Sequence, residues 1–261
     1  MRETWVTTLV FGLGLMAIEA LLAYVLATFQ NEVSGFFLNV AFVRRLLETL
    51  VGVELGDRSG EHLFLVLPWV HPVVLLVVWA HEITFCARLP AGEIDRGTVD
   101  LLLGLPVSRT RLYLCESLAW TFSGVVLLLL AMLGNRLGTL ASPDGAFPDS
   151  LRRLAVLINL YGLYLAIGGF AFLKSSLSDR RGRAVGAVFV FVVASFLLNF
   201  VAQWKPAESV RFLGVLNYYR PFVILRGGGW PLGDIAILFV TGVVAWGAGA
   251  IVFRRRDICT V

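Results

Sequence analysis

Hydrophobic and polar positions follow each other along the chain in long blocks, not in short alternation. Six apolar runs are separated by shorter segments that carry most of the charge. Crossing a hydrocarbon core about 30 Å thick takes roughly 20 helical residues, and each run is about that long. Because the runs are apolar at every position and not at every second one, they indicate helices rather than the strands of a membrane barrel. The expected spans are Trp5–Phe29, Leu63–Phe85, Leu112–Leu133, Leu154–Leu173, Ala184–Val201 and Ile235–Phe253.

The composition indicates an integral membrane protein. Hydrophobic residues make up 58% of the 261 positions and charged residues only 15%, which is more apolar surface than a soluble domain of this size buries. We therefore predict an all-α fold, a polytopic bundle of six transmembrane helices that forms one domain over residues 1–261. The first run contains Glu19 and lacks a small-residue cleavage site, so we expect a retained helix and not a signal peptide.

Basic residues predict the orientation of this bundle. A narrow majority of Lys and Arg lies in the N-terminus, in 87–111, in 174–183 and in the C-terminal tail, although these segments occupy much less sequence than the other connections. Two of them hold dense basic runs, at 180–183 and 254–256. The positive-inside rule places such segments in the cytosol, so both termini are predicted to be cytosolic. Anionic lipid headgroups explain basic residues at membrane boundaries, and no nucleic-acid partner is expected.

The connections on the outer side are long and only partly hydrophilic. In 36–53, Arg44 and Glu48 lie one helical turn apart among apolar residues, a pattern typical of an amphipathic helix at the membrane interface. The segment 209–224, which is rich in aromatic residues, is open to the same interpretation. Simple packing of each segment over the bundle is the alternative.

The segment 91–111 is a charged, turn-rich island between the second and third apolar runs. It is longer than a connection between two packed helices requires. Within it, Asp95–Leu103 begins with an acidic residue and has apolar residues near helical spacing, which predicts a short helix along the membrane surface. Pro106 would end this helix. Such a helix could transmit a push from outside the membrane to the two helices beside it.

The island has an ordered set of residues, Gly92-Glu93-x-x-Arg96-Gly97-Thr98, then Leu101-Leu102, then Pro106-Val107-Ser108-Arg109. This order resembles the cytosolic loop of type-2 ABC transporter permeases, an exporter class with six helices per subunit. The tail 253–258 resembles the basic end of many such permeases, and the helix count agrees, so the similarity covers nearly the whole chain. Where many of them have a lysine after the Pro-x-Ser-Arg element, this chain has Glu116. No role for a positive charge at the start of the third helix is therefore carried over.

The resemblance implies a permease subunit of an ATP-driven exporter in the cytoplasmic membrane of a prokaryote. Two permease subunits, identical or different, would pair among the membrane lipids, and each would receive a separate ATPase subunit that binds ATP and Mg. The island would be the coupling helix that docks on this ATPase. Glu93 and Arg96 would make charged contacts, Gly97 would allow the turn, and Arg109 would clamp the end of the loop on carboxylates or lipid phosphates. The predicted docking residues are Glu93, Asp95, Arg96, Gly97, Thr98, Pro106 and Arg109.

Two other interpretations of the island remain open. Arg96, Arg109 and Arg111 could be interfacial anchors without a docking role. The chain could also be a non-transporting membrane scaffold, which would use the same island to hold a cytosolic complex. A scaffold would bind its partner without affecting ATP hydrolysis.

Motifs of catalysis are weak. The two lysines, Lys174 and Lys205, do not follow a G-x-x-x-x-G pattern, so no phosphate-binding loop is expected, the chain is predicted not to be an enzyme, and ATP must be hydrolysed elsewhere. An intramembrane enzyme would have to use Glu19 or histidines such as His71 and His81. His81-Glu82 begins like a zinc-protease motif, but a phenylalanine stands where the second histidine is required. We expect packed, neutral histidines, and neither a cofactor nor a metal in this chain.

Three smaller features complete the predictions. The cysteines Cys86, Cys115 and Cys259 have no metal-type spacing, and no disulfide is expected. Glu19 is either a polar point on the translocation path or at a dimer contact, or it forms an internal hydrogen bond to a neighbouring helix, through Asn159 or Asn199. Glycines concentrate in the last three helices, which predicts close helix packing there.

Overall fold

Within the residues that the computed structural model describes, every regular element is helical. These residues are 2–28, 48, 60–99, 101, 104, 106–142, 149–201, 205–227 and 229–256. Six helices among them are long and apolar enough to cross a membrane, which confirms the predicted number and order of spans. The candidate spans are Trp5–Thr28, Leu63–Cys86, Arg109–Ala141, Ser150–Leu177, Arg181–Asn199 and Leu232–Arg255.

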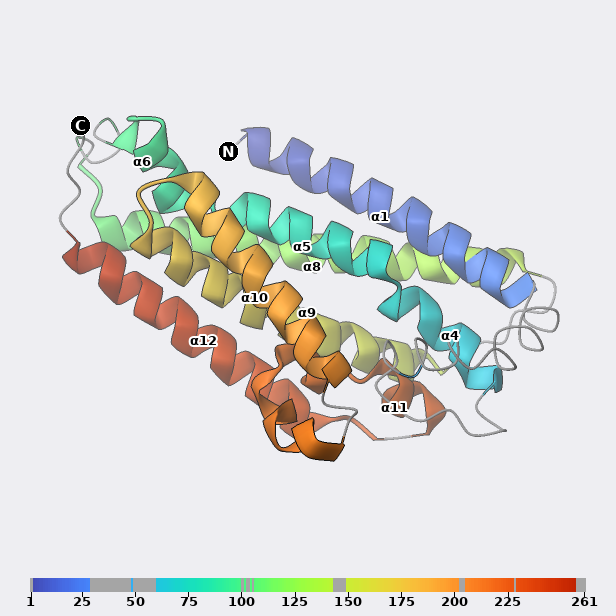
Figure 1. Ribbon diagram of the computed structural model, residues 1–261. Helices are drawn as coiled ribbons and strands as arrows, with labels where there is room; N and C mark the ends of the chain where they lie inside the picture. Colours follow the sequence, from blue (N-terminus) through green and yellow to red (C-terminus); the bar gives the residue numbers. More distant parts are fainter. Residues whose placement is uncertain are drawn as a thin grey trace.

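The elements follow one another as a chain of long helices joined by short ones (Figure 1). The long helices are α1 (Arg2–Thr28), α5 (Pro72–Cys86), α8 (Arg109–Ala141), α9 (Ser150–Leu177), α10 (Arg181–Val201) and α12 (Leu232–Arg255). The short elements are α4 (Gly60–Val70), the π-helix η1 (Arg88–Gly92), α6 (Glu93–Asp95), the 3₁₀-helices η2 (Lys205–Leu213) and η3 (Val215–Tyr218), and α11 (Pro221–Arg226).

The second span is broken at His71 into α4 and α5. Pro72 occupies the first turn of α5, where its missing N–H costs no hydrogen bond. The side chain of His71 caps this helix, because its Nδ1 accepts a hydrogen bond from the backbone N–H of Val73 at 3.3 Å. Two prolines in the outer half of this run predict such a bend, and His71 thereby has a structural role.

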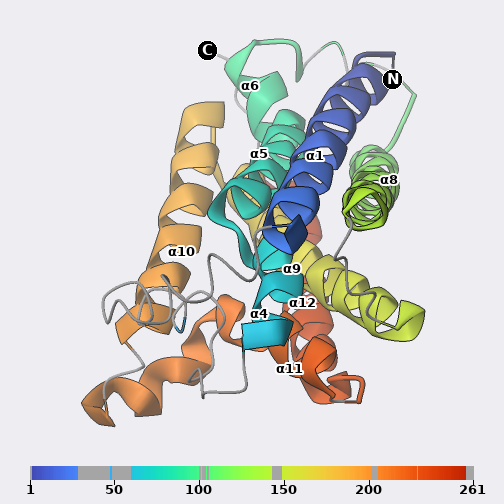
Figure 2. The same cartoon turned by 90° about the vertical axis from the view of Figure 1, so that its right-hand side faces the viewer.

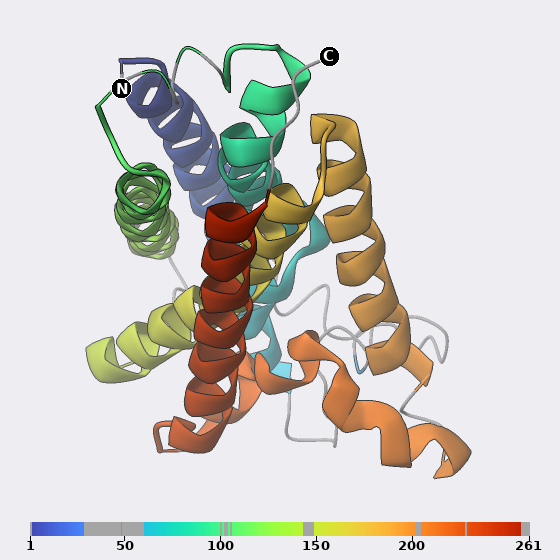
Figure 3. The same cartoon turned by 90° about the vertical axis from the view of Figure 1, so that its left-hand side faces the viewer.

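Two closely packed helix pairs form the body of the bundle, α1 with α8 and α9 with α12. Helix α5 contacts α1, α8 and α9 and so lies between the pairs. Helices α8 and α10 lie on opposite flanks (Figures 2 and 3). The beginning of α1, the end of α12 and α6 share one end of the bundle, while α4 and α11 lie at the other.

Glycines allow the close approach within both pairs. In α8, a Cβ added at Gly134 or Gly138 would lie well under 3.0 Å from a backbone carbonyl oxygen of α1. In the other pair, a Cβ at Gly169 of α9 would meet the backbone of Gly242 in α12 equally closely. Glycine packing among the last three helices is thus confirmed at Gly169 and Gly242. It is wrong for three other glycines of this region, which have nothing within 4 Å of an added Cβ: Gly182, Gly186 and Gly247.

Three predicted elements are extended by the structure, defined by it or lie outside the described residues. Helix α8 continues past Leu133 to Ala141. The segment 209–224 forms η2, η3 and α11, and its second half packs over the bundle, with Tyr219 donating a hydrogen bond to the carbonyl of Trp69 at 3.0 Å. Except for Glu48, the predicted amphipathic helix in 36–53 lies outside the described residues.

Candidate functional site

Residues 88–98, which we call the connecting segment, leave the end of α5 and form η1, α6 and a turn. The turn is at Gly97, whose φ of +68° lies in the left-handed region that suits glycine. This confirms the predicted turn. A helix that starts at Asp95 is wrong, because α6 ends at that residue and the chain then turns. Val99 and Leu101 are helical, and the intervening and following positions 100, 102, 103 and 105 lie outside the described residues.

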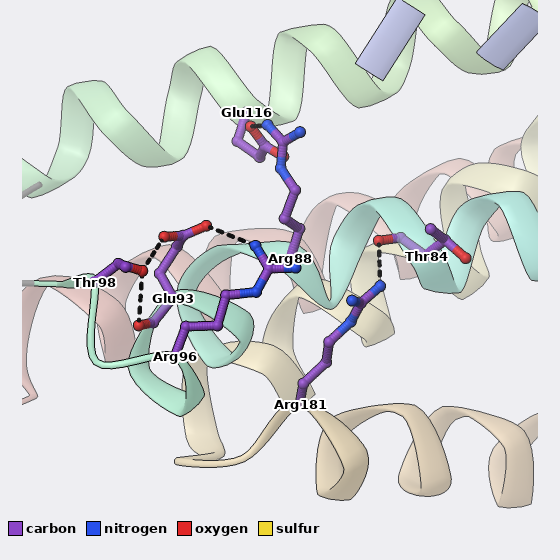
Figure 4. Close-up of polar contacts among 7 residues, drawn as sticks. All are labelled: Thr84, Arg88, Glu93, Arg96, Thr98, Glu116 and Arg181. Atoms are coloured by element: carbon purple, nitrogen blue, oxygen red, sulfur yellow. Dashed lines mark hydrogen bonds and ion pairs between the residues drawn. The ribbon is translucent and has the colours of Figure 1, made fainter. Parts of the chain in front are cut away.

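Glu93 closes this turn on itself (Figure 4). Its Oε2 accepts a hydrogen bond from the hydroxyl of Thr98 at 2.5 Å, and its backbone carbonyl accepts another from the N–H of Thr98 at 3.0 Å. Its Oε1 lies 3.8 Å from the guanidinium of Arg96. The Glu93 side chain is only 19% exposed, whereas that of Arg96 is 56% exposed. Glu93 therefore shapes the turn, and Arg96 presents its charge at the surface beside the exposed Asp95.

The connecting segment is attached to the bundle by polar contacts. The N–H of Ala91 donates to the Ser175 hydroxyl of α9 at 3.2 Å, and the N–H of Arg181 in α10 donates to the Asp95 carboxylate at 3.4 Å. The Arg181 side chain also donates to the carbonyl of Thr84 in α5 at 3.4 Å (Figure 4). Ala91 of the segment, together with Ala87 just before it, packs against Ala184 of α10. The segment is thus held in place and is not a free loop.

An ion pair attaches the segment to α8 as well. Arg88 lies 2.9 Å from the carboxylate of Glu116, whose side chain is 12% exposed. Sequence reasoning missed Arg88, Ser175 and Arg181. The basic run at 180–183 was noted as a marker of orientation, but no feature of the sequence indicates which side chain of the run faces the connecting segment.

Arg109 and Arg256 join the other chain segments at this end of the bundle. Arg109 is the first residue of α8, and its guanidinium donates to the backbone carbonyl of Arg256 at the end of α12. Its observed partner is therefore a carbonyl, where a carboxylate or a lipid phosphate was expected. Arg256 donates to the carbonyls of Ser176 and Ser178 and pairs with Asp179. Pro106 is exposed shortly before α8.

Replacing Arg256 by alanine is expected to loosen the connection between α9 and α10. Trypsin cleavage after Arg180 in detergent should then accelerate about tenfold or more, because a loss near 1.4 kcal/mol of local stability raises the open population tenfold. Mass spectrometry of the fragments measures the rate. Arg255→Ala is the matched control, because Arg255 is exposed on the last turn of the same helix. Equal cleavage in the two variants would contradict a role for Arg256 in holding this connection.

Glu19 is fully buried, and its Oε2 accepts a hydrogen bond from the side-chain amide of Asn135 in α8 at 3.0 Å. The internal hydrogen bond was one of the two expected roles, but the expected partners are wrong. Asn159 instead bonds the backbone of Tyr218 and Arg220. Asn199 lies on α10, whereas α1 packs against α8.

The buried histidine is packed among aromatic rings. His81 contacts the rings of Phe11, Phe85 and Tyr164, at centroid distances of 5.6–6.3 Å. Its Nε2 is 3.4 Å from the hydroxyl of Thr8. His71 lies about 15 Å away along the helix, at 1.5 Å per residue. The part of the chain that the structure describes contains no group of three His, Cys, Asp or Glu residues that could hold a metal. Cys86 is buried and Cys115 exposed, both unbridged, and Cys259 lies outside the described residues.

Almost the entire chain matches a known protein family. Residues 1–258 match the family model described as ABC-2 family transporter protein. The chain is 25% identical over 191 residues to a probable multidrug ABC transporter permease, YbhS, of Escherichia coli strain K12, and equally to that of strain O157:H7. The match covers 72% of this chain and 48% of each relative, so the chain spans about half the length of these curated relatives. No solved structure matches significantly.

Proposed function

Because this chain belongs to the ABC-2 family of transporters and is a multi-pass membrane component of an ABC transporter, we propose that it docks a separate ATPase subunit through the connecting segment. Two permease subunits pair and export a substrate across the inner membrane of a bacterium. ATP and Mg are bound by the ATPase subunit. The relatives are described as probable multidrug permeases, so amphipathic drugs are the first cargo to test.

One observation carries the docking proposal. The connecting segment presents two exposed charges of opposite sign, Asp95 and Arg96, at the end of the bundle where α1 begins and α12 ends. The same segment is bonded to α8, α9 and α10. A partner that binds these charges would therefore contact a surface whose displacement reaches the membrane helices. An interfacial anchor needs the charges but not these attachments.

The basic residues support a cytosolic position for this end. Arg180, Arg183, Arg254 and Arg255 are exposed there, and the positive-inside rule favours the cytosolic side for such a cluster. A docked ATPase requires that side, since ATP is available there.

The proposal predicts that the ATPase subunit co-purifies with the tagged chain in mild detergent and is lost when the charge of Arg96 is reversed. Arg96→Glu should reduce the recovered ATPase about tenfold or more, because placing like charges across an interface costs several kcal/mol and 1.4 kcal/mol is tenfold in affinity. Quantitative mass spectrometry measures the ratio. Arg226→Glu is the control, because Arg226 is an exposed arginine of α11 at the opposite end of the bundle.

The outcomes separate the alternatives. If no ATPase subunit co-purifies with the wild-type chain, the docking proposal is contradicted. It is also contradicted if Arg96→Glu recovers as much ATPase subunit as the wild type. An ATPase that binds normally but hydrolyses ATP at the same rate with and without the chain would favour the scaffold.

A further inference from the structure

The connecting segment lies at one end of the bundle and is bonded to both helix pairs. Ser175 belongs to α9 of one pair, and Glu116 belongs to α8 of the other. The contacts between the pairs are few compared with those inside each pair. A displacement of the segment can therefore change how the pairs lie relative to each other, provided that the bonds on both sides hold.

The bond to α8 is stronger than the others. The nitrogen and oxygen of Arg88 and Glu116 are 2.9 Å apart and both groups carry charge, whereas the bonds to α9 and α10 are 3.2–3.4 Å long and each has a backbone group as one partner. Hydrogen bonds with an ionised donor or acceptor are shorter and about twice as strong as neutral ones, and among these bonds of the segment Arg88–Glu116 has ionised side chains on both sides. The Arg88 guanidinium is also 5.8 Å from the centre of the Phe85 ring, which favours a cation over its face.

Glu116 depends on Arg88. The Glu116 side chain is largely buried, and its second carboxylate oxygen has no hydrogen-bond partner among the described residues. Glu93, of like charge, also acts on this carboxylate and disfavours its ionised form. Removing Arg88 would take away the cation that is hydrogen-bonded to a largely buried carboxylate, which is strongly unfavourable.

We infer that Arg88 and Glu116 are positioning residues that join the connecting segment to the first turns of α8, so that a docked ATPase moves segment and helix together. The inference rests on the proposed docking function and extends it. Because α1 packs closely on α8 at Gly134 and Gly138, the movement reaches α1 as well. The ion pair also accounts for the acidic Glu116 near the start of the third span, since Arg88, just after the end of the second span, supplies the positive charge.

The first test needs no ATPase. Hydrogen exchange of the full chain in detergent measures the protection of amides in the connecting segment. Arg88→Gln and Glu116→Gln should each raise exchange there about tenfold, the equivalent of 1.4 kcal/mol. The charge swap Arg88→Glu with Glu116→Arg should restore most of the protection, and Arg88→Lys should retain it. Arg111→Gln is the control, because Arg111 is exposed on the first turn of α8. Unchanged exchange in both single variants would overturn the inference, whatever the chain binds.

The second test uses the complex with its ATPase and a thiol reagent. Cys115 is exposed on α8 next to Glu116, and Cys86 is buried. With Cys259 replaced by serine, the modification rate of Cys115 reports the position of this helix. The rate should change severalfold when ATP and vanadate trap the ATPase, and the change should disappear in Arg88→Gln while the ATPase stays bound. The charge swap Arg88→Glu with Glu116→Arg should restore the change in the modification rate of Cys115.

The readings of this second test differ from those of the docking test. An unchanged rate in the wild-type complex, or a change that persists in Arg88→Gln, would overturn the transmission to α8 and leave docking intact. Absence of the ATPase from wild-type chain contradicts docking itself and thereby overturns the transmission that rests on it. Loss of the nucleotide effect with normal ATPase binding is a result that a merely stabilising ion pair would not give.

Discussion

Gly134→Ala is expected to destabilise the protein severely, although alanine is the better helix former. The added Cβ would lie well under 3.0 Å from the backbone carbonyl oxygen of Met16 in α1, and a backbone atom cannot move aside as a flexible side chain can. The two helices must separate, which loosens the contacts along the whole seam. Overpacking of this kind costs roughly 3 kcal/mol or more. Unfolding of the purified chain by increasing SDS, followed by circular dichroism or tryptophan fluorescence, measures the loss.

Gly14→Ala is the matched control for this prediction. Gly14 is a helical glycine of α1 with nothing within 4 Å of an added Cβ. There the same substitution gains the helix propensity of alanine, about 1 kcal/mol, without a clash. The two variants should therefore differ in sign, with Gly14→Ala neutral or stabilising. If Gly134→Ala is as stable as Gly14→Ala, α1 and α8 do not approach as closely as the structure shows.

The end of α8 shows which part of the fold could not be predicted from the sequence. The six spans follow from apolar runs, which is a local property of the chain, and the structure confirms them. The third run was predicted to end at Leu133, and the polar residues Asn135 and Arg136 follow shortly after it. The helix continues because Asn135 finds a buried partner on α1 while Arg136 faces outward. The partner of Asn135 and the outward direction of Arg136 both depend on where α1 packs against α8, and α1 is distant in sequence.

The candidate site was predictable to a similar extent. The turn at Gly97 follows from the residue type, because glycine suits a left-handed turn. The roles of Glu93 and Arg88 do not follow, since each depends on which polar or charged group its side chain meets in the folded chain. Glu93 meets Thr98 within the segment, and Arg88 meets Glu116 on another helix. The sequence therefore located the segment but not its attachments.

Asn135→Leu is expected to produce the second large loss of stability. It removes the amide that donates to Glu19 and leaves a fully buried carboxyl group without this donor. Stranding a buried polar group costs about 1–3 kcal/mol. Glu19→Gln keeps an acceptor oxygen in the same place, so its loss should stay below about 1 kcal/mol, within the range measured for single hydrogen bonds between membrane helices. SDS unfolding of the purified variants gives both values.

A double-mutant cycle then separates the structural role of Glu19 from a role on the translocation path. With Glu19→Leu, Asn135→Leu and the double variant, the double variant should be more stable than the sum of the two single losses predicts, because neither polar group is left without its partner. If the bond is purely structural, transport of a test drug should fall only in variants that lose stability. Reduced transport by Glu19→Gln at unchanged stability would instead place this carboxyl group on the path of the cargo or at a contact that moves during the cycle. The fully buried position of Glu19 between α1 and α8 favours the structural role, since a group on a water-filled path would be at least partly exposed.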